Sequence, residues 1–240
     1  MSASLSLRSC LWVVSFLLIA NTLFGARIGL FFGNFDPVHS AHLTIIEKSV
    51  SVLNLERMYA IPYLVSDSDF PVSFSSRCEM LQKALQSKGE NLKVPCEKLE
   101  LWNEERPLSS DPDSLTERIL KEIFYLEGWD HNYYQIMGSD DFQRMLKFQG
   151  FPSDEKPLSI VVIKRPGFNQ TIPRHLIPAL GERLFPIDLD TPRVSSKEIR
   201  GLLKQGVISP YLSDEVVQYI RARKLYGLED ALLQQPIRKE

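Results

Sequence analysis

Cysteine and histidine are scarce in this chain of 240 residues, which contains three cysteines and four histidines. The cysteines, Cys10, Cys78 and Cys96, form no C-x-x-C pair, and their spacing to the histidines matches no common ligand pattern. A structural zinc ion needs a closely spaced set of such ligands, so the sequence gives no sign of a zinc site. With so few cysteines, we also expect no disulfide framework.

The chain also lacks an excess of either charge. It has 28 lysines and arginines against 30 aspartates and glutamates, which gives a formal net charge of −2 and an isoelectric point near 6.1. A broad basic surface for nucleic acid is therefore not expected, although a local basic pocket is compatible with this balance. Hydrophobic residues make up 44% and charged residues 24%, which excludes a disordered or fibrous protein and fits one α/β domain or two small ones.

Residues 1–26 differ from the rest of the chain because they are almost without charge. Arg8 is followed by an uncharged, largely apolar run over residues 9–26. This run is compatible with a secretory signal, with a marginal membrane anchor, or with a leader that is not part of the working protein. A buried-strand pattern begins directly at Arg27, so a signal would be cut at the edge of the fold. We therefore expect a cytoplasmic protein, with membrane association through residues 9–26 as the open alternative.

The remaining chain alternates between strand-like and helix-like segments. Apolar runs predict strands over 27–32, 57–62, 92–101, 133–137, 158–163 and 183–189. Helical spacing of apolar residues, together with S-x-x-E capping boxes that begin at 76, 114 and 195, predicts helices over 40–53, from 76 onward, 114–126, 195–205 and 213–223. This alternation predicts an α/β fold with a doubly wound, Rossmann-like parallel sheet, whose ligands bind beyond the carboxyl ends of the strands.

The domain organisation follows from these elements. We expect residues 27–226 to form a single domain with a helical C-terminal segment, and residues 227–240 to form a tail. The apolar leader at 1–26 stands apart from this domain. The oligomeric state is left open by the sequence.

The clearest chemical signal follows the first expected strand. The segment Gly33-Asn-Phe-Asp-Pro-Val-His-Ser-Ala-His42 places a glycine turn and an Asp-Pro pair before two histidines that are three residues apart. A glycine lets the backbone approach a ligand closely, and the start of a helix attracts phosphate through its N–H groups and dipole. His39 and His42 lie on one side of that helix start and add hydrogen-bond donors or positive charge. A pair of core-edge or surface histidines is the alternative, but the strand and turn before them favour a phosphate site.

A second signal lies far downstream, in Val194-Ser-Ser-Lys-Glu-Ile-Arg200. Ser195 and Ser196 begin a helix, where their hydroxyl groups can cap the helix or bind phosphate oxygens. Arg200 lies one turn further and offers a planar fork of donors for β- and γ-phosphates. An ordinary N-cap with a solvated arginine is the alternative. Together with the first signal, this segment favours a triphosphate site.

These two segments carry a resemblance to a known family. Residues 29–43 resemble the T/HxGH signature of nucleotidylyltransferases, and the match is closest to the bacterial nicotinate-nucleotide adenylyltransferases; residues 194–200 resemble that family's Ile-Ser-Ser-Thr-x-Ile-Arg motif. Weaker matches extend over 27–226. The resemblance implies transfer of the adenylyl group of ATP, with Mg²⁺, to nicotinate mononucleotide, which forms deamido-NAD and pyrophosphate in NAD biosynthesis. It also implies that ATP and a pyridine mononucleotide are the partners, with no nucleic acid.

The resemblance also implies roles for individual residues. It makes His39, His42 and Arg200 catalytic, and it assigns ATP binding to Gly33, Asn34, Phe35, His39, His42, Ser195, Ser196 and Arg200. It assigns mononucleotide binding to Thr116, Gly138, Asp140 and Phe148. In this scheme Asp140 accepts a hydrogen bond from a ribose hydroxyl and Phe148 stacks on the pyridine ring; Asp141 as a helix cap and a core position for Phe148 are the alternatives. The Mg²⁺ ion would be carried by the phosphates, with no metal site on the protein.

The sequence departs from the family pattern at several positions. Phe32, Asn34, Ala41 and Lys197 stand where the family has Gly, Thr, Gly and Thr. Phe32 puts a large ring beside the expected nucleotide path unless it turns into the core. The segment 63–70 carries Asp67 and Asp69 instead of a basic loop, and these carboxylates would repel an anionic mononucleotide. Three alternatives therefore stay open: nicotinamide mononucleotide as acceptor, another phosphorylated acceptor, and a nucleotide-binding homologue without turnover.

Overall fold

The structure is a computed structural model that describes residues 25–63, 71–105, 112–139, 141–142, 158–164 and 183–234. The leader up to residue 24, most of the acidic segment at 63–70, Asp140, Phe148 and the end of the tail lie outside these residues. In the described part of the chain, no helix is both long enough and apolar enough to cross a membrane.

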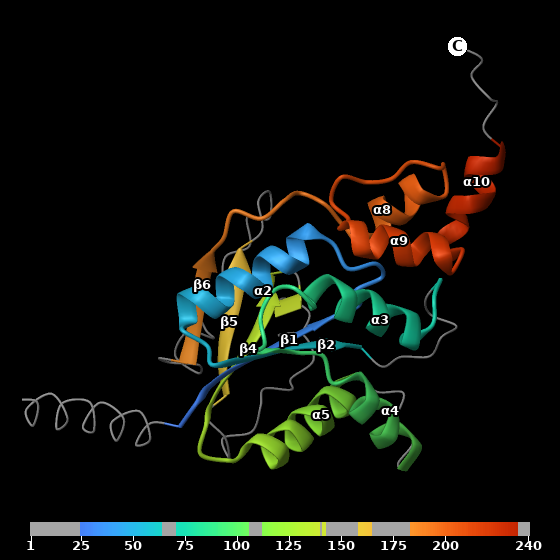
Figure 1. Cartoon of the computed structure of the whole chain (residues 1–240). Helices are drawn as coiled ribbons and strands as arrows, with labels where there is room; N and C mark the ends of the chain where they lie inside the picture. Colours follow the sequence, from blue (N-terminus) through green and yellow to red (C-terminus); the bar gives the residue numbers. More distant parts are fainter. Residues whose placement is uncertain are drawn as a thin grey trace, which may run out of the picture.

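A parallel sheet forms the middle layer of the molecule (Figure 1). Within the described residues it has six strands, in the spatial order β3-β2-β1-β4-β5-β6. The strands are β1 (Arg27–Gly33), β2 (Arg57–Pro62), β3 (Leu92–Lys93), β4 (Asn132–Gly138), β5 (Leu158–Lys164) and β6 (Leu184–Asp188). The order changes direction between β1 and β4, and in such a sheet the carboxyl ends of these two strands flank the ligand crevice. The expected doubly wound α/β fold is confirmed.

The central strand β1 is apolar from Ile28 onward because both of its faces are covered. Ile28, Leu30 and Phe32 point into one hydrophobic cluster, whereas Phe31 points into the other. This alternation is the two-residue period of a strand. In the register of the sheet, Phe31 lies between Ala60 of β2 and Ile136 of β4.

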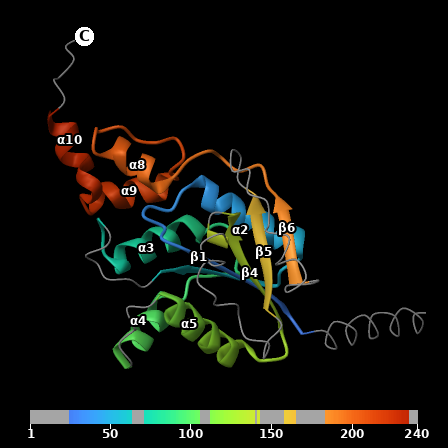
Figure 2. The same cartoon turned by 180° about the vertical axis from the view of Figure 1, so that it is seen from behind.

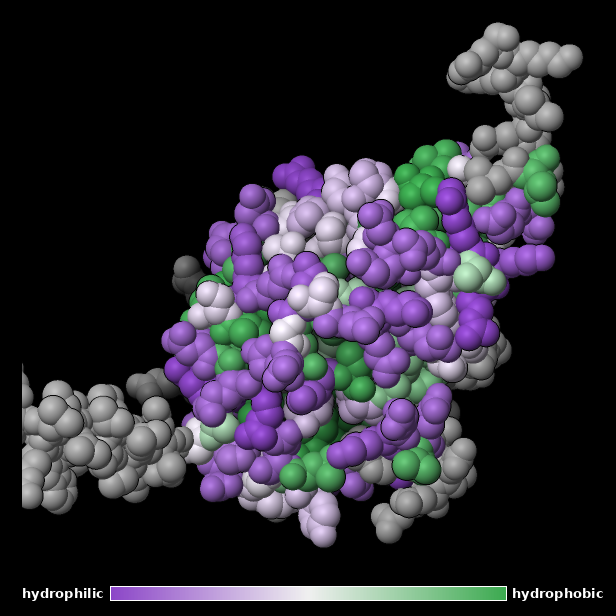
Figure 3. All heavy atoms as spheres, in the orientation of Figure 1, coloured by the Kyte–Doolittle hydropathy of each residue, from purple (hydrophilic) through white to green (hydrophobic). Residues whose placement is uncertain are grey.

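Helices form a layer on each side of the sheet, as Figures 1 and 2 show from opposite directions. One layer contains α2 (Ser40–Leu53), α3 (Phe74–Leu85), α8 (Ser196–Leu203), α9 (Asp214–Ala222), the short 3-10 helix η3 (Leu225–Gly227) and α10 (Leu228–Gln234). The opposite layer contains α4 (Cys96–Glu105) and α5 (Pro112–Glu127). The outer surface seen in Figure 3 is mostly hydrophilic, with hydrophobic residues in small separate groups, as expected over a buried core.

One expected strand was largely wrong. Residues 92–101 were expected to be extended, but β3 ends at Lys93 and the helix α4 begins at Cys96. Pro95 lies between them and cannot donate a ladder hydrogen bond, so the sheet pairing stops there. Cys96 and Leu99 are then buried at helical spacing, one turn apart, against the cluster below the sheet.

The starts of two helices also differ from the sequence expectation. The helix α3 begins at Phe74, and its N-cap is Ser73, whose hydroxyl accepts a hydrogen bond from the Ser76 N–H at 3.2 Å. The expected capping box at Ser76 is therefore wrong. The helix α5 begins at Pro112, two residues before the expected start, since proline suits the first helical position.

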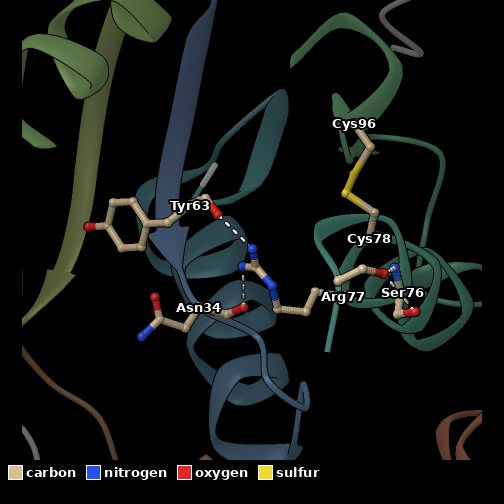
Figure 4. Close-up of a disulfide and its surroundings, with 7 residues drawn as sticks. Asn34, Tyr63, Ser76, Arg77, Cys78 and Cys96 are labelled. Atoms are coloured by element: carbon tan, nitrogen blue, oxygen red, sulfur yellow. Dashed lines mark hydrogen bonds between the residues drawn. A yellow bond between two sulfur atoms is a disulfide. The ribbon is translucent and has the colours of Figure 1, made fainter. Parts of the chain in front are cut away.

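The expectation against disulfides is wrong for one pair of cysteines. A disulfide joins Cys78 of α3 to Cys96 at the start of α4, with their Cα atoms 6.1 Å apart (Figure 4). The two cysteines are 18 residues apart in the sequence, and the turn from β3 into α4 brings them together. Spacing alone does not reveal such a pair, because it depends on how two helices pack.

Candidate active site

The candidate site is the loop that follows β1, at the carboxyl edge of the sheet. Gly33 ends the strand, and Phe35 folds its ring back over this residue in a left-handed backbone conformation with φ of 49°. A Cβ atom on Gly33 would lie 3.0 Å from Cζ of Phe35, so a side chain there would crowd the ring. A larger residue at this position would fit only if the Phe35 ring moved by a few tenths of an ångström. Asn34, at the tip of the loop, is exposed.

The two histidines of the first motif lie against each other at the start of α2. His39 occupies the N-cap position and His42 lies in the first turn; their ring centroids are 3.8 Å apart and the rings are stacked. The edge of Phe35 contacts His42, with centroids 5.0 Å apart. The first turn of α2 contains no acidic side chain. Two imidazoles at a positive helix end make this spot suitable for phosphate.

The second motif docks directly on this loop. Ser196 is the first residue of α8, and its hydroxyl donates a hydrogen bond of 3.0 Å to the carbonyl of Pro37. The guanidinium of Arg200 donates from Nη1 to the carbonyl of Asp36 at 2.6 Å and forms an ion pair with Asp36 Oδ2 at 3.3 Å. The structure therefore brings the imidazole pair and Arg200 to the same loop, although they are about 160 residues apart in the chain.

Ser195 caps α8 in the expected capping box. Its hydroxyl accepts a hydrogen bond from the Glu198 N–H at 3.2 Å, and Glu198 Oε2 accepts from the Ser195 N–H and hydroxyl, each at 2.8 Å. These hydrogen bonds lower the pKa of the Glu198 carboxyl, and the nearby His39 adds a smaller effect in the same direction. The Glu198 carboxylate therefore stays ionised and holds Ser195 in the helix cap.

Arg77 is a residue of this site that the sequence did not reveal as functional. It is fully buried in α3, and its guanidinium donates to the carbonyls of Asn34 and Tyr63, at 3.0 Å each (Figure 4). It thereby joins the loop after β1 to the residue after β2. The only signal in the sequence is a charged residue among apolar ones on the buried face of an amphipathic helix.

Asp36 and Tyr226 were also missed as partners. The Tyr226 hydroxyl donates a hydrogen bond of 2.7 Å to Oδ1 of Asp36, across 190 residues of sequence. No local pattern links the two.

Phe32 turns away from the loop. Its ring belongs to the hydrophobic cluster beneath the sheet and stacks on Tyr63, with centroids 5.9 Å apart. The imidazole pair lies on the other side, where Phe31 approaches His42 with centroids 6.3 Å apart. The strand alternation therefore removes the large ring from the expected nucleotide path.

Of the four residues expected to bind the mononucleotide, the structure describes Gly138 and Thr116, which lie on different elements. Gly138 ends β4; the pairing of Phe31 with Ile136 two residues earlier puts Gly138 level with Gly33. Thr116 lies on α5, on the opposite side of the sheet from α2 and α8 (Figure 1). Asp140 and Phe148 lie outside the described residues.

No protein metal site is found in the described residues: they contain no group of three or more His, Cys, Asp or Glu side chains that could hold an ion. The Asp36 carboxylate, which forms an ion pair with Arg200, also accepts the hydrogen bond of Tyr226. Within the described residues, the site thus offers a cation no set of protein ligands.

Known proteins resemble this chain in sequence and in fold. The family model described as cytidylyltransferase-like matches residues 30–202. The chain is 31% identical over 204 residues to a probable nicotinate-nucleotide adenylyltransferase of Bacillus licheniformis, covering 83% of this chain and 98% of that protein. It is 30% identical over 207 residues to a protein of the same name from Enterococcus faecalis, covering 83% and 84%. Its fold is similar to that of the Plasmodium falciparum nicotinic acid mononucleotide adenylyltransferase complexed with NaAD, with a TM-score of 0.60, 18% identity and coverage of 85% of this chain and 98% of that one.

Proposed function

The chain belongs to the cytidylyltransferase-like family, and from this premise we propose that it is a nicotinate-nucleotide adenylyltransferase. It transfers the adenylyl group of ATP to nicotinate mononucleotide and forms deamido-NAD and pyrophosphate, as a step of NAD biosynthesis in the cytoplasm. The observation that carries this proposal is the meeting of His39, His42 and Arg200 at one loop, at the carboxyl end of β1.

The reaction is an in-line substitution at phosphorus. A phosphate oxygen of the mononucleotide forms a bond to the α-phosphorus of ATP, the bond from that phosphorus to the bridging oxygen breaks, and pyrophosphate leaves with the electron pair. In such a transfer the protein mainly aligns the two reactants and stabilises negative charge on the phosphate oxygens. Mg²⁺ would accompany ATP as part of this substrate and would neutralise part of the negative charge of its phosphates.

The first motif supplies the donors for the triphosphate. His39 and His42 donate hydrogen bonds to its oxygens, with His42 nearest the reacting phosphorus, and the positive end of α2 adds to their effect. The backbone of Gly33, Asn34 and Phe35 lies along the same phosphates. The stacking of His39 on His42 keeps the two imidazole rings in fixed positions before the substrate binds.

The second motif receives the leaving group. Arg200 offers a planar set of donors to the β- and γ-phosphates, and Ser196 lies beside it at the start of α8. Ser195 keeps α8 capped and so keeps both groups in place. Thr116, Gly138, Asp140 and Phe148 are the proposed contacts to the mononucleotide. Because Phe32 packs away from the loop, it gives no reason to favour a homologue without turnover.

An assay of pyrophosphate release tests this function. The purified chain is incubated with ATP and Mg²⁺ together with either nicotinate mononucleotide or nicotinamide mononucleotide. We expect release with the nicotinate form and far less with the nicotinamide form. Release with the nicotinamide form alone would show a different acceptor, and ATP binding without release for either acceptor would contradict an enzymatic function.

A further inference from the structure

Asp36 is the centre of a three-residue chain that the reaction as described does not use. Its carboxylate is fully buried, with 0% exposure. One oxygen, Oδ1, accepts a hydrogen bond from the Tyr226 hydroxyl at 2.7 Å, and the other, Oδ2, lies 3.3 Å from Nη1 of Arg200. A buried carboxylate is costly unless it is paired; here Oδ1 has the hydrogen bond from Tyr226, and Oδ2 has the ion pair with Arg200 but no hydrogen bond within the described residues.

Tyr226 reaches this position through unusual backbone geometry. Tyr226 has φ of 59° and Lys224 has φ of 53°, both in the left-handed region that residues with a Cβ adopt rarely. Such conformations cost free energy and persist only where the surroundings enforce them, often at functional sites. The phenol ring is buried in the main hydrophobic cluster, together with Leu228. The C-terminal segment is therefore folded so that it delivers a hydroxyl group to Asp36.

The Tyr226 hydroxyl can act only as a donor to Asp36 at ordinary pH. Burial, followed by the nearby Asp36 carboxylate, raises the pKa of Tyr226 far above its usual value. The hydroxyl therefore keeps its proton and fixes the orientation of the carboxylate plane. With Oδ1 fixed in this way, Oδ2 faces the guanidinium of Arg200.

Arg200 uses only part of its guanidinium for this contact. The contacts to the Asp36 carbonyl and carboxylate both involve Nη1. A guanidinium has five N–H donors in a rigid plane, so fixing one nitrogen orients the remaining donors on Nη2 and Nε. The long arginine side chain would otherwise sample many rotamers, at a cost in entropy when it binds phosphate.

We propose that Tyr226 is a positioning residue for the transfer: through the Asp36 carboxylate it holds the Arg200 guanidinium in the orientation that receives the leaving pyrophosphate. This inference rests on the proposed function, in which Arg200 binds the phosphates of ATP. It adds the C-terminal segment to the machinery of the site. Tyr226 itself does not touch the substrate.

The substitution Tyr226→Phe tests this role because it removes one hydroxyl group and keeps the ring. We expect kcat to fall about tenfold and the Kd for pyrophosphate, measured by calorimetry, to rise about tenfold, as the loss of one charge-assisted hydrogen bond implies. The KM for nicotinate mononucleotide should stay within about twofold, because Arg200 does not hold that substrate. The matched control is Tyr219→Phe, in a neighbouring buried tyrosine whose ring lies against Lys83 and Arg223. It should change none of these constants.

A double-mutant cycle identifies Arg200 as the intermediary. In an Arg200→Ala background, Tyr226→Phe should have no further effect on pyrophosphate affinity, because the group that it orients is gone. An equal effect of Tyr226→Phe in both backgrounds would overturn the proposal. So would wild-type pyrophosphate affinity in the single variant.

The same measurements distinguish a failure of the proposed function from a failure of the role given to Tyr226. If Arg200→Ala itself binds pyrophosphate as the wild type does, the role given to Arg200 is wrong, whatever Tyr226 does. Should Tyr226→Phe fail to fold, as judged by circular dichroism, Asp36→Asn gives the same readout because it keeps the side-chain shape and removes the charge. Unchanged pyrophosphate affinity in Asp36→Asn would then overturn the proposal.

Discussion

His39 and His42 act as one unit because of how their rings are held. The rings stack with centroids 3.8 Å apart, and the edge of Phe35 supports His42 from the side. Both side chains are almost completely buried, so neither ring is free to rotate away from the other. Donors that are fixed before the substrate binds need no reorganisation in the transition state, which is the main source of electrostatic catalysis.

The substitution His42→Ala should abolish measurable turnover and leave the fold intact. Removing one well-placed donor to a developing negative charge lowers kcat by about 10²–10³-fold. Pyrophosphate release measures the loss, and circular dichroism checks the fold. The control is His131→Ala, at the amino-terminal end of β4, where Nδ1 accepts a hydrogen bond from the N–H of Ala26. Near-wild-type turnover in folded His42→Ala protein would contradict the role given to this imidazole.

Arg77 contributes to the site in a different way from the two histidines. A fully buried guanidinium that donates to two backbone carbonyls replaces the water that would otherwise solvate these groups. Asn34 and Tyr63 follow neighbouring strands, so the arginine fixes the distance between two loops at the edge of the site. Its role is to shape the loop that carries the histidines.

At the scale of elements, α3 connects the site to the layer below the sheet. Arg77 braces the loop after β1, and the next residue, Cys78, is bonded to Cys96 of α4 (Figure 4). One helix is therefore tied to the site through a guanidinium and to the opposite helical layer through a covalent bond. The position of α3 determines the shape of the loop, and the disulfide helps to hold α3.

Loss of this disulfide should destabilise the protein. A bond that closes a loop of 18 residues in the unfolded chain contributes about 3 kcal/mol by the loop-entropy estimate. We expect reductant to lower the melting temperature of the wild type, which circular dichroism measures. The Cys96→Ser variant should melt lower and show no response to reductant, whereas Cys10→Ser should keep the wild-type response. Equal melting of the wild type with and without reductant would argue against the bond.

At the scale of the whole molecule, three tyrosines that are buried or half-buried donate their hydroxyl protons in hydrogen bonds within the fold. Tyr226 donates to Asp36, Tyr59 of β2 donates to Glu127 at the end of α5, and Tyr133 of β4 donates to the carbonyl of Gly128 at 2.6 Å. Burial raises the pKa of all three above the usual value, and a nearby carboxylate adds to the effect in each case. The folded protein therefore binds the tyrosine protons more tightly than the unfolded chain.

The free energy of unfolding should decrease at alkaline pH. The unfolded chain loses its tyrosine protons near pH 10 while the folded protein keeps them, so the stabilisation is complete below about pH 10 and is lost as the pH rises above it. For Tyr226 the loss is about 1.4 kcal/mol per pH unit in that range. Urea unfolding between about pH 8 and 11 measures it.

Two variants separate this effect from general alkaline unfolding. The stability advantage of the wild type over Tyr226→Phe should shrink above about pH 10, because phenylalanine does not titrate. Tyr125→Phe, which removes an exposed hydroxyl group on α5, is the matched control for the loss of one tyrosine. A constant difference between the wild type and Tyr226→Phe across this range would contradict the raised pKa.

The sequence by itself determined the features that depend on neighbouring residues. The apolar runs of β1, β2, β4 and β5 and the helical spacing of α2 appear in the structure within a residue or two of the expected bounds. The capping box at Ser195 is confirmed as well. Strand burial, helix amphipathicity and capping act over a few residues, so a short window of sequence contains them. The two segments that predict a phosphate site, 33–42 and 194–200, belong to this class, because each is a strand or loop that leads into a helix.

Only the tertiary structure decided the contacts between distant segments. Three of these contacts have no signal in the local sequence. They are the disulfide between Cys78 and Cys96, the hydrogen bonds from Arg77 to the carbonyls of two loops, and the hydrogen bond from Tyr226 to Asp36. Residues 92–101 were expected to form a strand, whereas Pro95 and the packing of Leu99 favour a helix from Cys96. Such contacts depend on how whole elements pack around the core, and that packing is set by the sum of many burial terms along the chain. For this reason the sequence predicts a site at this loop, whereas the fold determines how Arg200 is held there.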